Sequence, residues 1–556
     1  MPAHVVENMH PSTPLKLDSF AQELHDHPDK SFVAAILFDI SHGANLGFRG
    51  KHYPRSTRNA KSARINPSII TESIQKELKL GHTIGPFKRP PLKNFVCNSL
   101  GLRPKKSGGF RIIMDLSQPT LDSVNDNISK EDHSLVYSRI DDAVAFIHKH
   151  GHGSLLAKID VKHAFRLCPV RKEDWHLLGF FWEGCYFFDR VLPFGLRSAP
   201  YLFNRIADAI HWIVSHRARN TDFLHYLDDF LTVGLANTNA CQHNMDVMLQ
   251  SCHHLGVPIA TEKVEGPCSV ITFLGVELDT VNMVIRLPKD KLADLLIKLP
   301  SCLTRHTCSK RELLSLIGCL SFACKCIPAG RIFLRRMIDI SMTATSLSQV
   351  ITLTDEFWHD VQWWCDFLPS WNGTASLLNP NWIPSPEFEL FTDASATLGY
   401  GAFYKGHWFT NTWPTFITND PLYSIACKEL LPILLSSLIW GHLWFGLRIR
   451  FHCDNISVVQ IWKKGSSSCP RIMQLVRLLF FTAASNNFHV MISHISGFNN
   501  DIADSLSRQQ ILRFQRLAPQ ADRVPTKTPD LCTLLTAPMC DVVPSTSHNK
   551  PATTST

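Results

Sequence analysis

The sequence lacks the cysteine and histidine spacings that bind zinc. It contains 17 Cys and 27 His, but it has no Cys-x-x-Cys pair and no zinc-finger or zinc-knuckle pattern. A metal or disulfide framework is therefore not indicated, and we expect reduced, mostly buried thiols. The fold must instead be held by hydrophobic cores, for which 34 Phe and 13 Trp supply ample material.

The N-terminal region lacks the apolar segment of a secretory signal, because charged residues are spread through it: Glu7, Lys16, Asp18 and Glu23. We therefore expect an intracellular protein, in the cytoplasm or the nucleus. Elsewhere Leu430–Leu447 carries no charge and is long enough to be considered as a membrane span. It contains Pro432 and several Ser, Gly and His residues, so we interpret it as a buried helix and expect no contact with a membrane.

Acidic residues are absent between Asp39 and Glu72, where the sequence has a run of basic ones: Arg49, Lys51, Arg55, Arg58, Lys61 and Arg64. We interpret residues 1–84 as a basic N-terminal arm that is partly disordered, with contact to phosphate groups as the alternative. The formal net charge of +8 fits a polyanionic partner without establishing one.

The length of 556 residues suggests about three or four domains. Residues 85–282 alternate strand-like and helical patterns, which predicts a mixed α/β domain; the strands are expected at Phe110–Met114, Leu155–Asp160, Phe223–Tyr226, Phe230–Val233 and Val270–Leu278. Residues 283–385 read as a helical connection, with a capping box at Ser309 and Glu312. A Pro-rich linker at 379–386 precedes a second region of strands and helices, 386–510, and a largely disordered tail, 511–556.

Two expected strands end near acidic residues. Apolar residues on both sides of Asp228-Asp229 predict a tight hairpin with two carboxylates at its tip. If Asp160 joins them, three carboxylates in one cleft require divalent cations, and ligation by oxygen alone favours Mg²⁺ or Mn²⁺. Two such ions can carry out nucleotidyl transfer. An Asp-Asp pair by itself more often marks a surface turn, so the context must decide.

That context resembles a reverse transcriptase. Tyr226-Leu227-Asp228-Asp229 resembles the Tyr-x-Asp-Asp signature of this family, and Asp160 to Phe165 resembles the preceding motif. Between them, Leu192 to Pro200 is similar to the Pro-Phe-Gly-Leu-x-x-Ala-Pro segment of retrotransposon polymerases. The resemblance implies that Asp160, Asp228 and Asp229 are catalytic and bind two metal ions.

The same resemblance implies a set of substrate-binding residues: Arg111, Phe165, Phe194, Gly195, Tyr226 and Lys263. Phe165 would be the steric gate that excludes a ribose 2′-hydroxyl, Arg111 would bind the incoming triphosphate, and Phe273-Leu274-Gly275 matches the primer grip. A core aromatic is the alternative for Phe165, and an exposed strand Arg is the alternative for Arg111. Retroviral enzymes have Gln at the position of Phe194, whereas gypsy-like and DIRS-like elements share the pattern seen here.

A second set of acids follows in the order strand, helix, strand, helix: Asp393, Glu429, Asp454 and Asp504. This set resembles ribonuclease H, whose four acids bind two Mg²⁺ ions that activate water against an RNA phosphodiester. His494 has the spacing of the family histidine, with a core or surface role as the alternative. Asp501 competes with Asp504, but Ala503 to Arg508 resembles the Ala-Asp-x-Leu-Ser-Arg ending of retroelements, so we choose Asp504 and interpret Asp501 as an N-cap.

Further phrases resemble DIRS-type retrotransposons, the tyrosine-recombinase retroelements: Asp115-Leu116-Ser117-Gln118-Pro119, Phe165 to Val170 and Pro328 to Leu334. The resemblance runs from about residue 95 to 525. A recombinase and an aspartic-protease motif are not found, so we expect one segment of an element, with a recombinase encoded separately as one possible partner.

We therefore predict an α/β (α+β) multidomain chain: a right-hand polymerase with fingers, palm and thumb, a helical connection, and a ribonuclease H-like domain with a five-stranded mixed sheet. The implied activity is RNA-directed DNA synthesis with removal of the hybrid's RNA strand. The implied substrates are an RNA template, a DNA primer, an RNA:DNA hybrid and deoxynucleoside triphosphates, with two Mg²⁺ or Mn²⁺ ions per site. The second hypothesis is a decayed or domesticated copy that binds nucleic acid without catalysis.

Overall fold

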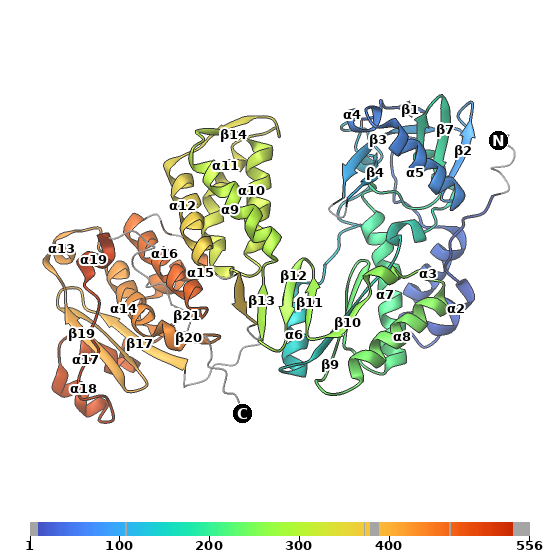
Figure 1. Cartoon of the computed structure of the whole chain (residues 1–556). Coiled ribbons are helices and arrows are strands. Elements are labelled where there is room, and N and C mark those ends of the chain that lie inside the picture. Colours follow the sequence, from blue (N-terminus) through green and yellow to red (C-terminus); the bar gives the residue numbers. More distant parts are fainter. Residues whose placement is uncertain are drawn as a thin grey trace. The chain divides into compact units, whose positions relative to one another are not determined.

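The computed structural model describes residues 9–105, 108–371, 373–377, 388–465, 467 and 469–536. The chain divides into two compact units, Met1–Ile271 and Thr272–Thr556 (Figure 1). Helices and several separate sheets occur in both, which confirms the predicted mixed α/β multidomain class. The division falls before residue 282, where the sequence placed the end of the palm.

The first unit contains a six-stranded sheet in the order β1-β3-β6-β7-β2, with β4 paired to β3. Its strands are Arg55–Ser56 (β1), Thr83–Phe87 (β2), Val96–Pro104 (β3), Phe110–Asp115 (β4), Gly179–Trp182 (β6) and Cys185–Asp189 (β7). The β3 and β4 strands form an antiparallel pair that carries Arg111 opposite Arg103. We assign this sheet to the predicted fingers.

A four-stranded sheet in the order β10-β5-β9-β8 forms the second layer of this unit. Its strands are Leu155–Asp160 (β5), Phe223–Tyr226 (β8), Asp229–Gly234 (β9) and Glu265–Cys268 (β10). The helices Ile140–His150 (α6), Ala199–Ala218 (α7) and Ala240–Leu255 (α8) pack on it. Asp160 ends β5 and Asp229 begins β9, so acids predicted for the palm lie at one end of this sheet.

The N-terminal residues are folded over the described range 9–84, which corrects the prediction of a partly disordered arm. They form the helices Leu17–Glu23 (α2), Lys30–His42 (α3), Lys61–Arg64 (α4) and Pro67–Lys79 (α5). Phe20, Ile36 and Ile70 are fully buried in the core of the unit. The basic tract is partly neutralised by distant acids, since Arg55 pairs with Asp122 at 3.0 Å. Charge density along the chain did not reveal these long-range partners.

The second unit contains a helical region where the sequence predicted a helical connection. Its helices are Lys289–Leu303 (α9), Lys310–Ala323 (α10), Arg335–Met342 (α11) and Asp355–Ser370 (α12). The predicted capping box is present, because the Ser309 side chain accepts from the Glu312 backbone N–H and the Glu312 side chain accepts from the Ser309 N–H. The predicted linker at 379–386 lies outside the described residues.

The predicted strand Val270–Leu278 is instead a hairpin of two strands, Val270–Phe273 (β11) and Val276–Asp279 (β12). Leu274 and Gly275 form its turn, with φ of 45° and 80°. Both residues adopt left-handed conformations, which two-residue hairpin turns require. The β12 strand continues the sheet through Val284–Arg286 (β13) and Thr374–Ser376 (β16).

The C-terminal part is a five-stranded mixed sheet in the order β19-β18-β17-β20-β21, as predicted. The strands are Glu389–Ala394 (β17), Gly399–Tyr404 (β18), His407–Thr412 (β19), Arg448–Cys453 (β20) and His489–His494 (β21). The β17–β20 and β20–β21 pairs are parallel and the others are antiparallel. The helices Ile425–Trp440 (α14), Ile456–Lys464 (α15), Pro470–Ser485 (α16) and Asp501–Ser507 (α17) accompany it.

Helix α14 is the one described segment apolar and long enough to cross a membrane, counted as Ile425–Leu443. In the structure 72% of its most apolar window is buried. The helix packs against both α16 and the sheet, and Leu431, Ile433 and Leu434 are fully buried. These contacts agree with the interpretation of this segment as a core helix.

The described part of the tail is also folded, which corrects the prediction that residues 511–556 are largely disordered. It contains Ile511–Leu517 (α18) and Leu531–Thr536 (α19). Phe514 is buried against Trp408, with ring centroids 4.7 Å apart, and Leu531 is buried in the core beside α16. Residues 537–556 lie outside the described part of the chain. Two short apolar patterns within a Pro- and Thr-rich composition were too weak to predict this docking.

A buried ionic cluster links the fingers to the palm. The Arg166 guanidinium lies 2.6 Å from the Asp189 carboxylate and 2.7 Å from the Glu77 carboxylate. His82 lies 2.8 Å from the same Glu77 oxygen. Burial opposes the ionisation of Glu77, but the His82 hydrogen bond and the Arg166 charge outweigh it and lower the pKa of Glu77 to about 2. Helix α5, which carries Glu77, strand β7, which carries Asp189, and the turn Ala164–Leu167, which carries Arg166, are therefore held together.

We expect Arg166→Met to destabilise the first unit by about 3–5 kcal/mol, because it leaves the buried Asp189 carboxylate without its guanidinium partner and the partly exposed Glu77 carboxylate with His82 alone. Urea unfolding followed by tryptophan fluorescence measures the effect. Arg49→Met is the matched control, since the Arg49–Asp132 pair is 75% and 47% exposed and its loss should cost at most about 1 kcal/mol. Equal urea midpoints for Arg166→Met and Arg49→Met would contradict a stabilising role for the ionic cluster around Arg166.

Candidate active sites

Three acids of the first unit meet at one end of the palm sheet. Asp160 is the last residue of β5 and lies directly opposite Asp229, the first residue of β9. Leu227 and Asp228 form the turn between β8 and β9, in which Leu227 has a φ of 53°. The Val161 N–H donates to the Asp228 carbonyl oxygen at 2.9 Å. The predicted hairpin is therefore present, and its register brings Asp160 to its tip.

The three carboxylates destabilise one another's charged forms. Burial raises the pKa of Asp229 to about 6, and the nearby charges of Asp228 and Asp160 add to the effect. Burial and the charge of Asp160 also raise the pKa of Asp228. Lys263 donates to an Asp160 oxygen at 2.9 Å, and this hydrogen bond raises the pKa of the lysine. Lys263 interacts with all three acids, while Lys158 and Arg111 lower the pKa of Asp229 and Asp228 respectively without cancelling the rise.

A cavity of about 620 Å³ opens beside these acids. Six of the predicted site residues line it: Arg111, Asp160, Phe165, Phe194, Asp228 and Lys263. The Arg111 guanidinium lies 4.6 Å from the centroid of the Phe194 ring, and the Phe165 and Phe194 rings are 5.4 Å apart. The structure thus gathers two cations, two aromatic faces and two carboxylates around one space. Among the described residues, Gly195, Tyr226 and Asp229 are not part of the lining.

Gly195 has a backbone role next to Phe194, which lines this cavity. Its φ is 114°, and a Cβ at this position would lie 2.0 Å from the Met114 carbonyl oxygen. The Met114 N–H donates to the Phe194 carbonyl at 3.0 Å, so this segment lies directly along the end of β4. Tyr226 instead faces Tyr137, with ring centroids 5.0 Å apart.

Sequence reasoning missed Asn125, which is 5% exposed. Its side-chain amide donates to the Gly195 carbonyl at 2.8 Å and accepts from the Arg197 N–H at 2.8 Å. It therefore fixes the loop that presents Phe194. A signal was available, because Asn125 belongs to the phrase Ser123-Val124-Asn125-Asp126, which accompanies Asp115 to Pro119 in the resemblance to DIRS-type elements, but no role was assigned to it. Lys76, Lys105 and Lys162 also line the cavity, and no local pattern distinguished them from other surface lysines.

Four acids of the second unit gather at one edge of the five-stranded sheet. Asp393 lies near the end of β17, and Asp454 directly follows β20. Because β17 and β20 are parallel, their carboxyl ends lie at the same edge. Glu429 comes from the second turn of α14, and Asp504 from α17, which packs on β17 and β18. The structure therefore brings together all four acids predicted for the second site.

Burial and mutual repulsion act on this cluster more strongly than on the first. Burial raises the pKa of Glu429 to about 9, with further contributions from the charges of Asp393 and Asp454. Burial likewise raises the pKa of Asp393 to about 6, although a hydrogen bond from Ser507 opposes the shift. Glu429 is 3% exposed and Asp393 is 6% exposed.

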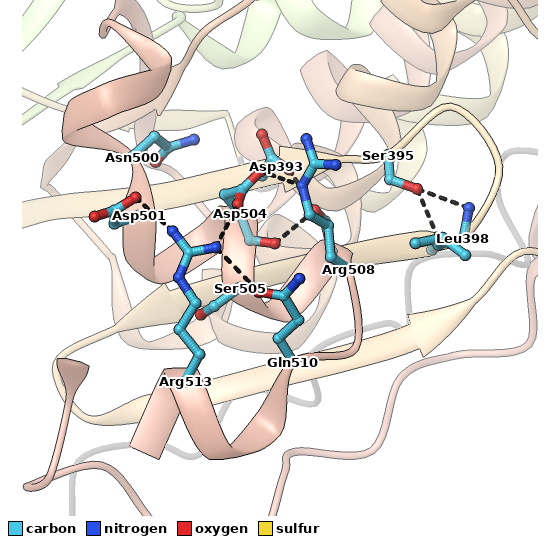
Figure 2. A network of polar contacts seen from close by, with 12 residues as sticks. Asp393, Ser395, Leu398, Asn500, Asp501, Asp504, Ser505, Arg508, Gln510 and Arg513 are labelled. Atoms are coloured by element: carbon cyan, nitrogen blue, oxygen red, sulfur yellow. Dashed lines mark hydrogen bonds and ion pairs between the residues drawn. The ribbon is translucent and has the colours of Figure 1, made fainter. Parts of the chain in front are cut away.

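Several neighbours of this cluster were not predicted. Ser507 donates to the Asp393 carboxylate. Arg508 lies 2.5 Å from one Asp504 oxygen (Figure 2). The ligand atoms of Glu429, Cys453 and Asp454 all lie within 4.8 Å of one another. Burial raises the pKa of the Cys453 thiol, so this group remains protonated beside the carboxylates.

His494 is the last residue of β21 and lies beside Cys453 in the sheet. It is exposed, which agrees with a position at the rim of the acidic cluster rather than in the core. Asp501 is the first residue of α17, where Asn500 occupies the N-cap position. The interpretation of Asp501 as the N-cap is therefore wrong by one residue, and its carboxylate instead pairs with Arg513 at 2.8 Å.

The chemistry of both donor sets fits divalent cations. Each cluster offers several carboxylates whose charged forms are disfavoured by burial and by one another, and a bound cation would remove that repulsion. Carboxylate oxygens are the ligands that Mg²⁺ and Mn²⁺ prefer. The residues that could hold them are Asp160, Asp228 and Asp229 in the first site and Asp393, Glu429, Asp454 and Asp504 in the second.

Residues 103–278 match the family model described as reverse transcriptase (RNA-dependent DNA polymerase). The transposon Tf2-3 polyprotein of Schizosaccharomyces pombe is 24% identical over 424 residues, which are 73% of this chain and 28% of that protein. The Tf2-7 polyprotein of the same organism is 23% identical over 424 residues, again 73% of this chain and 28% of that protein. The chain spans just over a quarter of the length of these curated relatives.

Among solved structures, the foamy viral protease-reverse transcriptase in complex with dsDNA has a TM-score of 0.46 and 16% identity, covering 88% of this chain and 99% of that chain. The same protein in complex with an RNA/DNA hybrid has a TM-score of 0.46 and 15% identity, covering 87% and 64%. The family model and the polyprotein relatives agree with the geometry of the first acidic cluster. The chain therefore contains a reverse transcriptase domain, and over most of its length it is similar to transposon polyproteins.

Proposed function

We propose that this protein is an RNA-directed DNA polymerase with ribonuclease H activity, which copies retroelement RNA into DNA and degrades the RNA strand of the hybrid. One observation carries the proposal. Each compact unit gathers acids from separate elements at one sheet edge, and the first gathering lies within the reverse transcriptase domain. The proposed substrates are an RNA template, a DNA primer, the RNA:DNA hybrid and deoxynucleoside triphosphates.

In the polymerase site, Asp160, Asp228 and Asp229 would hold two Mg²⁺ or Mn²⁺ ions, which when bound activate the primer 3′-hydroxyl and stabilise the pyrophosphate leaving group. The chain's own groups do the positioning. Arg111 and Lys263 line the cavity beside the acids, where each can pair with phosphate oxygens. Phe165 lies between Phe194 and Phe203, so its ring is held in place where it can exclude a 2′-hydroxyl.

In the nuclease site, Asp393, Glu429, Asp454 and Asp504 would hold two further ions, which when bound activate water against the RNA phosphodiester. Ser507 fixes the orientation of the Asp393 carboxylate. His494 is exposed at the rim beside Cys453, where an imidazole can exchange protons with solvent or assist product release. The buried thiol of Cys453 has no part in this chemistry.

We also infer a DIRS-type element as the source, because the phrases at 115–119, 165–170 and 328–334 resemble that group. Sequencing the DNA next to this reading frame tests the inference. A neighbouring tyrosine-recombinase frame supports it, and an integrase of the LTR-element type contradicts it. An intracellular location, in the cytoplasm or nucleus, is part of the same proposal.

Separate single substitutions should uncouple the two activities. We expect Asp228→Asn to lower primer extension on poly(rA)/oligo(dT) at least about 100-fold while RNA cleavage persists, and Glu429→Gln to do the reverse, because even the loss of an outer-shell partner of a metal costs about 10–100-fold. The Glu429→Gln protein should keep the wild-type melting temperature, since the pKa of Glu429 of about 9 means that the metal-free carboxyl is already neutral at pH 7.

The same two assays separate the proposal from its competitors. A wild type that binds the hybrid but neither extends nor cleaves would identify a nucleic-acid-binding protein without catalysis. Cleavage without extension would identify a nuclease with an inactive polymerase.

The Mg²⁺ requirement of primer extension should depend on pH. Asp229 has a pKa of about 6, raised above its usual value, so below pH 6 a proton competes with the cation for its carboxylate. Lowering the pH from 7.5 to 5.5 should raise the Mg²⁺ concentration for half-maximal extension about fourfold for one displaced proton. Measuring extension rates across an Mg²⁺ series at both pH values tests this. An unchanged Mg²⁺ midpoint contradicts the coupling, and saturating Mg²⁺ should restore most of the rate.

Replacing the proposed steric gate should relax sugar selection. We expect Phe165→Val to raise the ratio of ribonucleotide to deoxynucleotide incorporation by about 10–200-fold, the range that shape differences in an apolar pocket provide. Single-nucleotide kcat/KM values for dTTP and UTP measure the ratio. Phe203→Leu is a matched control, because Phe203 contacts Phe165 but is fully buried and does not line the cavity. A ratio that Phe165→Val leaves unchanged assigns Phe165 to the core.

A further inference from the structure

Arg513 reaches the nuclease acids from a helix that follows the ribonuclease H-like region. It belongs to α18, beyond residue 510, where the sequence placed the end of the domain. One guanidinium nitrogen, Nη1, lies 3.1 Å from Asp504 Oδ2, and the other, Nη2, lies 2.8 Å from Asp501 Oδ1. Figure 2 shows this side chain extending between the two acids. A single arginine therefore bridges a proposed metal ligand and a neighbouring acid.

Both oxygens of Asp504 have an arginine partner. Arg508 Nε donates to Oδ1 at 2.5 Å, and Arg513 Nη1 donates to Oδ2 at 3.1 Å. The two arginines are held differently. Arg508 is 52% exposed, and in the described part of the chain its side chain is hydrogen-bonded to Asp504 alone. Arg513 is 37% exposed and is also anchored by Asp501 and by the Gln510 side chain, at 3.0 Å.

These anchors decide which arginine stays in place when a cation binds Asp504. A cation at Oδ1 displaces only the single contact of Arg508. Arg513 can keep its contact with Oδ2 because its guanidinium is a planar fork that already rests on Asp501 and Gln510. The carboxylate is then held by a charge-assisted hydrogen bond on one oxygen while the other faces the cation. Such partners orient metal ligands and tune their affinity.

The position of Arg513 is in turn set by the packing of α18. Phe514, the next residue, is 1% exposed and lies against Trp408, with ring centroids 4.7 Å apart. Leu506 of α17 belongs to the same apolar cluster. The helix is therefore fixed to the sheet by one buried ring, and the preceding side chain is presented to α17 at a defined place. Asp501 gains a role from this arrangement, as the anchor of Arg513.

We propose that Arg513 is a positioning residue for the nuclease site, which holds the Asp504 carboxylate in the orientation that binds a divalent cation. The inference rests on the proposed ribonuclease H function and deepens it. It makes α18 part of the active site, so that the functional nuclease extends past the strand and helix pattern recognised in the sequence.

Cation binding tests the proposal without requiring activity. The full-length chain with Asp228→Asn and Asp229→Asn, which weaken the polymerase site, is titrated with Mn²⁺ in a calorimeter. In this background we expect Arg513→Met to raise the Kd for Mn²⁺ at the nuclease site by about 10–100-fold. Arg513→Lys keeps the positive charge but not the planar guanidinium. Its Kd for Mn²⁺ should therefore lie between the Kd of the background protein and the Kd of Arg513→Met.

Arg516→Met is the matched control, since Arg516 lies on the same helix, is exposed and, among the residues that the structure describes, donates only to the Leu512 carbonyl. Its Kd should equal that of the background protein. Asp501→Asn keeps Arg513 and its Gln510 contact but weakens the Asp501 anchor by removing its charge, and should shift the Kd in the same direction by a smaller factor. If the melting temperature shows that Arg513→Met does not fold, Asp501→Asn and Arg513→Lys still test the proposal.

Hybrid cleavage gives the second readout. In the otherwise wild-type chain, Arg513→Met should raise the Mg²⁺ concentration for half-maximal cleavage while KM for the hybrid changes less than about twofold, because the substitution acts through the metal ligand. A purely structural role for α18 would lower the melting temperature and the yield of active protein without moving the Mg²⁺ midpoint.

The outcomes distinguish the two proposals. A Kd for Mn²⁺ in Arg513→Met within twofold of the background value overturns the positioning role. The role is also overturned if the background protein shows no Mn²⁺ binding that is lost on Glu429→Gln substitution. Binding that depends on Glu429 and Arg513, without any cleavage by the wild type, supports the positioning role and overturns the proposed nuclease function.

Discussion

Repulsion between carboxylates at a sheet edge is the constraint on which the rest of this structure depends. In both units, acids lie at or next to the ends of paired strands, so that negative charges meet where the sheet stops. Each cluster lies in a partly buried place, where the charged forms are further disfavoured, and the pKa values of Asp229 and Asp393 rise to about 6 as a result. Folding alone would not favour such an arrangement. The arrangement is the one that our proposal of two cation-binding sites requires.

The two sites manage this repulsion by different means. In the palm, a single flexible lysine, Lys263, pairs with Asp160, and its side chain is 58% exposed. Such a partner can move away when a substrate or cation arrives. In the second site, Ser507, Arg508 and Arg513 surround Asp393 and Asp504 from α17 and from the helix after it. The planar guanidinium of Arg513 is anchored at three points, so this site is more fully organised before any cation binds.

The sequence predicted the parts of both sites that are local. The sequence indicated Asp160, the Asp228 hairpin and the four later acids, because each lies beside an apolar strand or in a short motif. The pairing of β5, β8 and β9 then brings Asp160 to the tip of the hairpin. Contacts between distant segments could not be found this way. Arg55 was assigned to a basic arm because no residue near it in the sequence indicates its partner Asp122. Helix α18 was assigned to a disordered tail because the contact of Phe514 with Trp408 forms only in the folded chain. The hairpin at Leu274 and Gly275 was read as one strand because apolar residues continue across the turn.

Helix α14 shows how one composition can serve two purposes. Its uncharged, apolar sequence has the length of a membrane span, yet the helix lies between α16 and the sheet with its side chains buried on every face. Glu429 stands at its N-terminal end, in the same apolar surroundings, and this burial is the largest cause of its pKa of about 9. The feature that imitates a membrane segment is therefore the feature that keeps water from Glu429. A carboxyl held neutral in this way can ionise when a cation takes the place of its proton, so the core of the domain sets the chemistry at its edge.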